Sequence, residues 1–119
     1  MTILLVLNDH VELKRLERMV SGVYPGAEIV SFDNAEDALS YSEEHKVHIC
    51  YTEVVMKRMS GIALAKHLRR KKDEIIINFI SDTTEYALDG WKLFVNDYIL
   101  KPITIDAVKH TRERGQWAS

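Results

Sequence analysis

Short apolar runs alternate along the chain with longer segments whose apolar residues recur at helical spacing. Nearly continuous apolar residues predict strands over 3–7, 27–32, 47–52, 75–80 and 97–100. Between them, apolar residues at every third or fourth position predict helices over 11–20, 84–95 and 103–114, and two more that begin near residues 35 and 60. Five strand–helix units, with helices too short for a bundle, indicate an α/β fold with a doubly wound parallel sheet.

Polar residues follow four of the predicted strands. They are Asn8-Asp9, Thr52-Glu53, Ser81-Asp82 and Lys101-Pro102. The carboxyl ends of parallel strands lie at one edge of a sheet, so we expect these side chains to surround one pocket. Two carboxylates, a hydroxyl and an ammonium are groups that can hold a divalent cation and a phosphoryl group.

Composition narrows the classes of protein to consider. The chain has 119 residues, 46% of them hydrophobic, which favours a single folded domain. Its formal net charge of −2 gives no general reason to expect binding to nucleic acid or to an anionic membrane. No apolar run approaches the roughly 18 residues of a membrane span, and no basic flank of a signal peptide precedes the first run. We therefore expect a cytoplasmic location.

The chain resembles the CheY-like receiver domain of two-component response regulators over about residues 2–114. That family has an acidic pair after strand one, a phospho-accepting Asp after strand three, Ser or Thr after strand four, and Lys-Pro after strand five with an aromatic residue three positions earlier. The corresponding residues are Asn8-Asp9, Glu53, Ser81, Lys101-Pro102 and Tyr98. Segment 53–61 is similar to the family's Asp-x-x-Met-Pro-x-Met-x-Gly loop. Segments 85–88 and 96–103 are similar to receivers that precede LytTR-type DNA-binding domains.

The resemblance implies a flavodoxin-like sheet in the order 2-1-3-4-5. It also implies a receiver domain over residues 1–114, followed by a tail or the start of a linker to an effector domain over 115–119. We expect any contact with DNA to lie in that effector, outside these residues. A sensor histidine kinase is the expected signalling partner.

The acceptor position departs from the family pattern. In the family, an Asp attacks the phosphoryl donor beside a bound Mg²⁺ and forms an acyl phosphate. Glu53 extends the carboxylate by one methylene, about 1.5 Å. Misplacement of about this size can slow in-line chemistry on the order of a hundredfold. We therefore expect phosphorylation of Glu53 to be slow or absent.

The metal position departs as well, because Asn8 removes one carboxylate of the acidic pair. The resemblance implies Asp9, Glu53 and the backbone carbonyl of Val55 as ligands of Mg²⁺, with Asn8 able to contribute only a weak neutral oxygen. Counting Asp9, Glu53 and Lys101, the pocket carries a charge of −1. We expect Mg²⁺ binding to be weak or absent.

Each pocket residue also has an alternative interpretation. Glu53 could pair with Lys101 and close the pocket, could stand in for a phosphorylated Asp, or could still accept a phosphoryl group; we favour the pairing. Asp9 could serve only as the N-cap of the first helix. Ser81 could donate to Glu53 or to a bound anion, or could be an ordinary serine at the end of a strand.

In the family, phosphorylation draws the strand-four hydroxyl inward and the strand-five aromatic residue follows, so Ser81 and Tyr98 are the implied switch. If Glu53 stands in for phosphate, Ser81 should hydrogen-bond to it and Tyr98 should point inward. If Lys101 neutralises Glu53, Tyr98 should lie outward in an inactive-like state. We favour the second outcome.

The predicted fourth helix contains more apolar residues than one helical stripe can bury. Two explanations are open: an unusually deep core, or an exposed apolar face that includes Leu88, Trp91 and Phe94. The family uses the face formed by helix four, strand five and helix five for dimerisation, so the second explanation implies a homodimer.

Two hypotheses for function follow. We favour a non-enzymatic, atypical receiver that regulates an attached or partner output domain, as in transcription regulation, through protein–protein contacts. The alternative is a receiver that catalyses Mg²⁺-dependent phosphotransfer to its own carboxylate. A nucleotide hydrolase would need a Gly-rich loop followed by Lys-Ser or Lys-Thr, which the sequence lacks.

Overall fold

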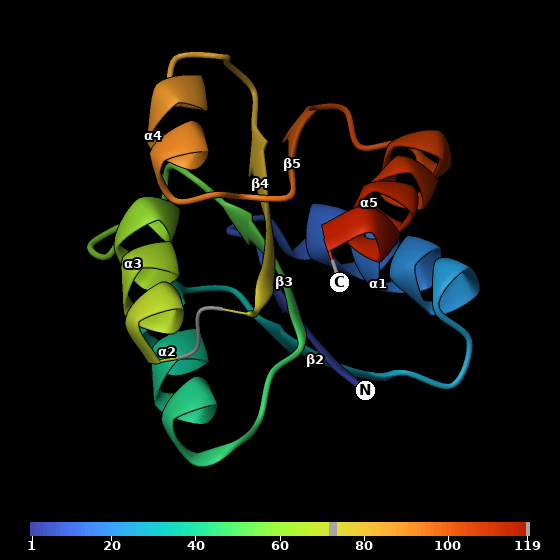
Figure 1. Ribbon diagram of the computed structural model, residues 1–119, viewed down its shortest axis with the longest axis horizontal. Helices are drawn as coiled ribbons and strands as arrows, with labels where there is room; N and C mark the ends of the chain where they lie inside the picture. The colour runs from blue at the N-terminus through green and yellow to red at the C-terminus, as the bar shows by residue number, and fades with distance from the viewer. Residues whose placement is uncertain (72–73, 119) are drawn as a thin grey trace.

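Five parallel strands form the centre of the fold in the computed structural model, which describes residues 1–71 and 74–118 (Figure 1). The strands are β1 (Thr2–Val6), β2 (Glu28–Phe32), β3 (Ile49–Glu53), β4 (Ile76–Ser81) and β5 (Asp97–Leu100). They pair in parallel in the order β2-β1-β3-β4-β5. This confirms the predicted fold class and sheet order, and strand boundaries differ from the predicted ones by at most two residues.

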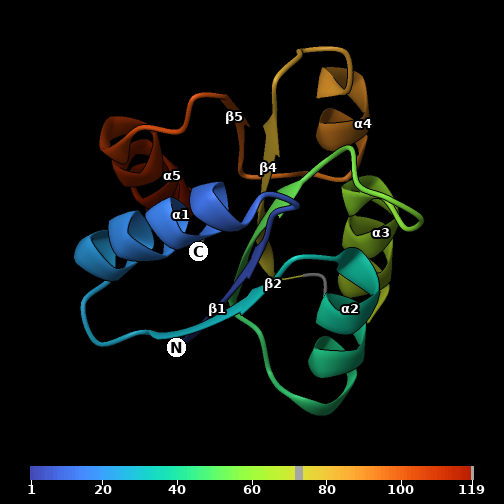
Figure 2. The same ribbon diagram turned by 180° about the vertical axis from the view of Figure 1, so that it is seen from behind.

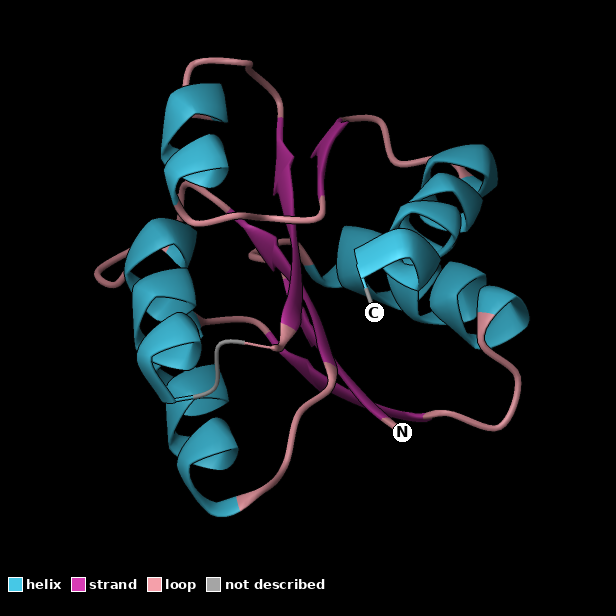
Figure 3. Cartoon of the chain, in the orientation of Figure 1, coloured by secondary structure: helices cyan, strands magenta, loops and turns pink. Residues whose placement is uncertain are grey.

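Helices cover both faces of the sheet. One face carries α1 (His10–Val23) and α5 (Ile105–Ala118); the other carries α2 (Ala35–Glu44), α3 (Gly61–Lys71) and α4 (Ala87–Lys92) (Figures 1 and 2). The same three layers are visible by element type in Figure 3. None of the described helices has the length and apolar character needed to cross a membrane.

The two covered faces explain why the central strands are apolar throughout. Successive residues of a strand point to opposite faces. In β1, Leu4 and Val6 join the core beneath α2 and α3, whereas Ile3 and Leu5 join the core beneath α1 and α5. On β3, burial raises the pKa of the Cys50 thiol to about 12, so the thiol stays protonated and unreactive at neutral pH.

The fourth helix is shorter than its apolar spacing predicted, spanning 87–92 instead of 84–95. Before it, the hydroxyl of Ser81 accepts a hydrogen bond from the N–H of Thr83 and stabilises a non-helical turn. After it, Phe94 has a φ of 55°, in the left-handed region that ends helices. Local hydrogen bonds and backbone conformation set both ends, and helical spacing does not report them.

The last helix ends later than predicted. It begins at Ile105 and continues to Ala118, past the predicted end near residue 114. Gly115 is buried within it. Residues 115–118 are thus helical, and Ser119 lies outside the described residues. The interpretation of 115–119 as a tail or the start of a linker to an effector domain stays a prediction.

Gly61 fixes the loop that leaves β3. Its N–H donates to the carbonyl of Val54 at 2.9 Å. A Cβ added at residue 61 would lie 1.9 Å from the carbonyl oxygen of Glu53, a backbone atom that cannot move aside as a side chain could. The absence of a side chain at Gly61 therefore lets α3 begin directly against the end of β3, beside the Glu53 position.

We expect Gly61→Ala to lower the free energy of unfolding by about 1–3 kcal/mol, because the added methyl group overpacks against backbone. The control is Gly22→Ala in α1, where an added Cβ meets nothing within 4 Å. That change should raise stability by about 0.5–1 kcal/mol, since alanine is the better helix former. Urea denaturation followed by circular dichroism measures both; equal effects would contradict the role given to Gly61.

Candidate functional site

Glu53, at the end of β3, is the centre of the site. Its side chain is 11% exposed, and both carboxylate oxygens are bonded. Oε1 accepts from the backbone N–H of Asn8 and from Asn8 Nδ2, each at 3.0 Å. Oε2 accepts from the ammonium of Lys101 at 2.5 Å. The predicted pairing of Glu53 with Lys101 is therefore present.

Lys101 follows β5 and precedes a cis peptide bond to Pro102. Its Nζ also donates to Glu12 Oε1 at 2.9 Å, so it bridges β3 and α1. Burial disfavours the charged ammonium, but hydrogen bonds and charges from Glu53 and Glu12 together outweigh it and raise the pKa of Lys101. A raised lysine pKa keeps the ammonium, and its contribution to stability, fully present at neutral pH.

Glu12 is a site residue that the sequence analysis missed. It lies in the first turn of α1, where an acidic residue is favoured by the helix N-terminus alone. With Asp9, Glu12 and Glu53 against one Lys101, the formal charge of the pocket is 1 − 3 = −2, which corrects the expected −1. The sequence offered one signal: Glu12 lies three residues after Asp9, the candidate N-cap at the same sheet edge.

Asn8 connects three segments at this edge. Besides its two bonds to Glu53, its Nδ2 donates to the carbonyl of Val55 at 2.9 Å. The side chain therefore ties the end of β1 to both the end of β3 and the loop before α3. The structure brings Asn8, Glu53, Val55 and Lys101 together as one bonded cluster.

Asp9 is placed differently from the other predicted ligands. Its Oδ1 accepts from the backbone N–H groups of Val11 at 2.8 Å and Glu12 at 3.0 Å, so it is the N-cap of α1. The bond from Glu12, which has the larger effect, and the bond from Val11 hold the pKa of the Asp9 carboxyl below its ordinary value. Among the described residues no hydrogen bond joins Asp9 to Asn8 or Glu53, so the capping alternative describes its contacts.

The two switch residues are at the expected positions but form other contacts. Ser81 is buried, and within the described part of the chain its hydroxyl accepts from Thr83 N–H at 3.2 Å and forms no bond with Glu53. Tyr98 points inward: its ring meets Phe79 edge-on at 6.3 Å between centroids. Its hydroxyl donates to the carbonyl of Thr83 at 2.6 Å.

The prediction that Tyr98 would lie outward beside a Glu53–Lys101 pair is therefore wrong. The physical reason is that neither contact of Tyr98 involves the pair. Phe79 belongs to the core, and Thr83 belongs to the turn after β4. Both favour an inward ring whatever the partner of Glu53.

The apolar residues of the fourth helix are exposed. Within α4 only Gly90 is buried, and Leu88, Trp91 and Phe94 are 61%, 76% and 82% exposed. For these three residues the explanation by a deeper core is wrong. We call Leu88, Trp91 and Phe94 the α4 apolar face.

Arg69 of α3 fixes the end of this face. Its guanidinium donates to the carbonyls of Leu93 at 3.2 Å and Phe94 at 3.3 Å, directly after α4. It also donates to the carbonyl of Ile75 at 2.6 Å, directly before β4. One side chain thus joins α3, the end of α4 and the start of β4.

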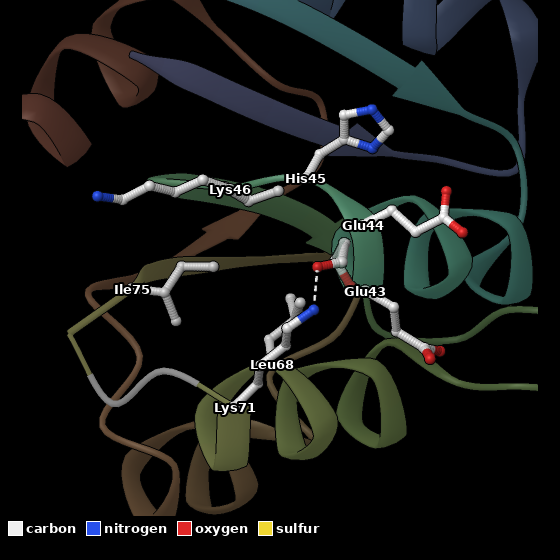
Figure 4. Close-up of a pocket in the computed structure, with 9 residues that line it drawn as sticks. Glu43, Glu44, His45, Lys46, Leu68, Lys71 and Ile75 are labelled. Atoms are coloured by element: carbon white, nitrogen blue, oxygen red, sulfur yellow. Dashed lines mark hydrogen bonds between the residues drawn. The ribbon is translucent and has the colours of Figure 1, made fainter.

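Two hollows differ in their relation to the site. An open one of about 800 Å³ lies beside the bonded cluster and is lined by Asn8, Val55 and Lys57, among others. A second, of about 320 Å³, lies between the ends of α2 and α3 at the opposite edge of the sheet, where Lys71 donates to the carbonyl of Ser42 (Figure 4). No predicted site residue lines this second hollow.

Comparison with known proteins gives consistent matches. The family model for the response regulator receiver domain matches residues 3–112. An uncharacterized response regulatory protein of Vibrio cholerae is 31% identical over 114 residues, which cover 93% of this chain and 44% of that protein. The transcriptional regulatory protein NatR of Bacillus subtilis is 27% identical over 110 residues, covering 92% and 47%. The chain thus spans about half the length of these relatives.

Solved structures show the same fold. The response regulatory domain of MrkE from Klebsiella pneumoniae matches with a TM-score of 0.89 at 24% identity, covering 99% of this chain and 97% of that one. The response regulator TrrA of Thermotoga maritima, in complex with Mg(2+)-BeF, matches with a TM-score of 0.83 at 22% identity, covering 96% and 97%. Because the family model covers most of the sequence, this chain belongs to the response regulator receiver domains.

Proposed function

We propose that this chain is an atypical receiver that controls an output domain through protein contacts, without relying on an acyl phosphate at residue 53. One observation carries the proposal: both oxygens of the Glu53 carboxylate already have partners within the protein. Lys101 supplies a full positive charge, and Asn8 supplies two N–H donors. The resting site is therefore closed around its own carboxylate.

This bonding opposes phosphoryl transfer. A carboxylate nucleophile must present an oxygen to the incoming phosphorus in line with the leaving group. Here Oε1 accepts two hydrogen bonds from Asn8 and Oε2 accepts one from Lys101, so the attacking oxygen is already hydrogen-bonded, and less nucleophilic, in a mostly buried setting. The extra methylene of Glu53 displaces the carboxylate further, and misplacement of about 1 Å can slow such chemistry on the order of a hundredfold.

The side chains also do not fit the metal that the family uses. Receiver domains bind Mg²⁺ at the phosphorylation site, as in the Mg(2+)-BeF complex of TrrA. In the described part of this chain, no three His, Cys, Asp or Glu side chains are arranged to hold a metal. The expected ligand Asp9 caps α1, and the oxygens of Glu53 and Val55 bind Asn8. We propose that Mg²⁺ binding is weak or absent.

Two alternatives have partial support. The inward Tyr98 is what a Glu53 that imitates phospho-Asp would produce, but the hydroxyl of Ser81 is bonded to Thr83 instead of Glu53. The presence of Lys101 and Ser81 near a carboxylate supports a working phospho-acceptor. The bonding of both Glu53 oxygens to groups within the protein favours the first proposal over both.

For output, we propose an effector domain outside this chain. The chain spans 44% and 47% of two relatives, one of them a transcriptional regulatory protein. We propose a DNA-binding effector of the LytTR type, with a sensor histidine kinase as a second partner. On this proposal the receiver itself contacts protein and the effector contacts DNA.

The α4 apolar face is the surface we propose for a homodimer. Trp91 and Phe94 are large aromatic residues of the kind that dominate binding energy at interfaces. Asp89 and Lys92 flank them, both exposed and opposite in charge. In a two-fold dimer each patch meets its own copy, so Asp89 of one copy can pair with Lys92 of the other.

Incubation with Mg²⁺ and acetyl phosphate tests the acceptor proposal by intact-mass measurement. We expect Glu53→Asp to gain a phosphoryl group at least about a hundredfold faster than the parent chain, because Asp restores the shorter reach. The matched control Glu53→Gln has no nucleophilic carboxylate and should gain none at this position. A hydroxylamine-sensitive phosphate on Glu53 of the parent would support the phospho-accepting alternative instead.

Trp91→Ala should weaken self-association by about 2 kcal/mol or more, roughly thirtyfold in dissociation constant. Sedimentation equilibrium measures it. Val11→Ala is the matched control, since Val11 is 70% exposed but lies at the start of α1.

Glu53→Gln should leave the dimer unchanged, because the α4 apolar face makes no contact with Glu53. If Glu53→Gln abolished a dimer formed by the parent chain, Glu53 would be acting as a stand-in for phosphate, and the proposal of a neutralised carboxylate would fail.

A further inference from the structure

We infer that the side-chain amide of Asn8 takes the place of the divalent cation at this site. The two oxygens it joins, Glu53 Oε1 and the carbonyl of Val55, belong to two of the residues that the resemblance to receiver domains implied as ligands of Mg²⁺. Nδ2 lies 3.0 Å from the first and 2.9 Å from the second. The nitrogen therefore occupies the space between them.

The chemistry of the amide suits this position. A side-chain NH₂ group has two N–H donors, and Asn8 directs one to each oxygen. Mg²⁺ would bind the same oxygens at about 2.0–2.1 Å and would need the space that the nitrogen fills. Amide and cation are therefore mutually exclusive at this point.

The amide is neutral, so it replaces the geometry of a cation but not its charge. The charge comes from Lys101, whose ammonium binds the other oxygen of Glu53 and also Glu12. A cation both joins the ligand oxygens and offsets their charge. Here Asn8 does the first, and Lys101 offsets the charge of Glu53.

Asp9 completes the argument. Its Oδ1 caps α1 by accepting from the N–H groups of Val11 and Glu12, which leaves Oδ2 as the oxygen of this carboxylate that a metal could use. The cap holds the Asp9 side chain against the start of α1, and it forms no hydrogen bond to Asn8 or Glu53 among the described residues. A metal entering this site would have to displace the amide of Asn8.

The consequence is a loop between β3 and α3 that is held in place without metal. In the proposed atypical receiver, this loop keeps one conformation whatever the Mg²⁺ concentration. The inference deepens the proposed function. It rests on that proposal in one respect: both describe Glu53 as held by hydrogen-bond donors of the protein itself. It concerns metal binding alone, so its test does not depend on phosphorylation or on dimerisation.

The direct test uses Mn²⁺ as a paramagnetic probe in ¹⁵N NMR of the parent chain. With the amide in the cation position, Mn²⁺ at stoichiometric concentration should not selectively broaden the signals of residues 8, 9 and 53–55. Selective broadening of those signals in the parent would overturn the inference. This measurement requires no variant and is informative whether or not a substitution is tolerated.

Asn8→Asp provides the second arm, because it removes the NH₂ donors and restores a carboxylate. We expect Mn²⁺ affinity, measured by water-proton relaxation, to rise by about tenfold or more, since cation affinity follows the number of charged ligands. The matched control is Lys66→Gln, on the exposed side of α3, which lowers net charge by the same amount.

Lys66→Gln should bind Mn²⁺ as weakly as the parent. A folded Asn8→Asp variant that binds Mn²⁺ no more tightly than Lys66→Gln would overturn the inference. That result would not decide the proposal about the phospho-acceptor, which the acetyl phosphate experiment tests separately. If Asn8→Asp gains affinity but the parent is phosphorylated on Glu53, the inference about Asn8 holds and the proposed function fails.

Discussion

The carboxyl edge of the sheet depends on one requirement: the mostly buried Glu53 carboxylate must have partners. Removing one member of a buried ion pair typically costs about 3–5 kcal/mol, because the other charge stays buried without compensation. The donors that meet this requirement come from different segments, Asn8 after β1 and Lys101 after β5. Lys101 in turn binds Glu12 on α1. One charge thus holds together the ends of three strands and the start of a helix.

Family membership and site chemistry give different answers because they depend on different residues. The fold needs apolar strands that alternate along the chain with helices, and this chain keeps that pattern through all five strands. Phosphoryl transfer needs a few side chains at fixed lengths and charges, and two of these differ at Asn8 and Glu53. Each change is small in volume, so the core tolerates both. On the function proposed above, together they exchange a metal-binding arrangement for a hydrogen-bonded one, and the receiver would lose its chemistry while its sheet and helices remain intact.

The parallel sheet and the meeting of Glu53 with Lys101 could be predicted because apolar runs and strand ends report them directly, whereas the strand order came from the resemblance to receiver domains. Glu12 could not, since an acid in the first helical turn has a sufficient local reason to be there, and its partner is 89 residues away. The inward Tyr98 depends on the ring of Phe79 and a carbonyl in a turn, which no periodicity records. The length of α4 was overestimated for the same reason. The hydroxyl of Ser81 stabilises a turn before the helix, and the left-handed Phe94 lies directly after its end.

The burial of only one α4 residue, Gly90, has a consequence for local unfolding. A helix of six residues is too short to be stable alone, and this one contributes almost no buried apolar area of its own. Its stability comes from the residues on either side of it and from the guanidinium of Arg69 at its end. Such a segment is expected to open at lower free energy than the sheet and to exchange its amide hydrogens first. A partner that covers Trp91 would therefore also stabilise α4 against this opening, so that binding is coupled to the local unfolding of one helical segment.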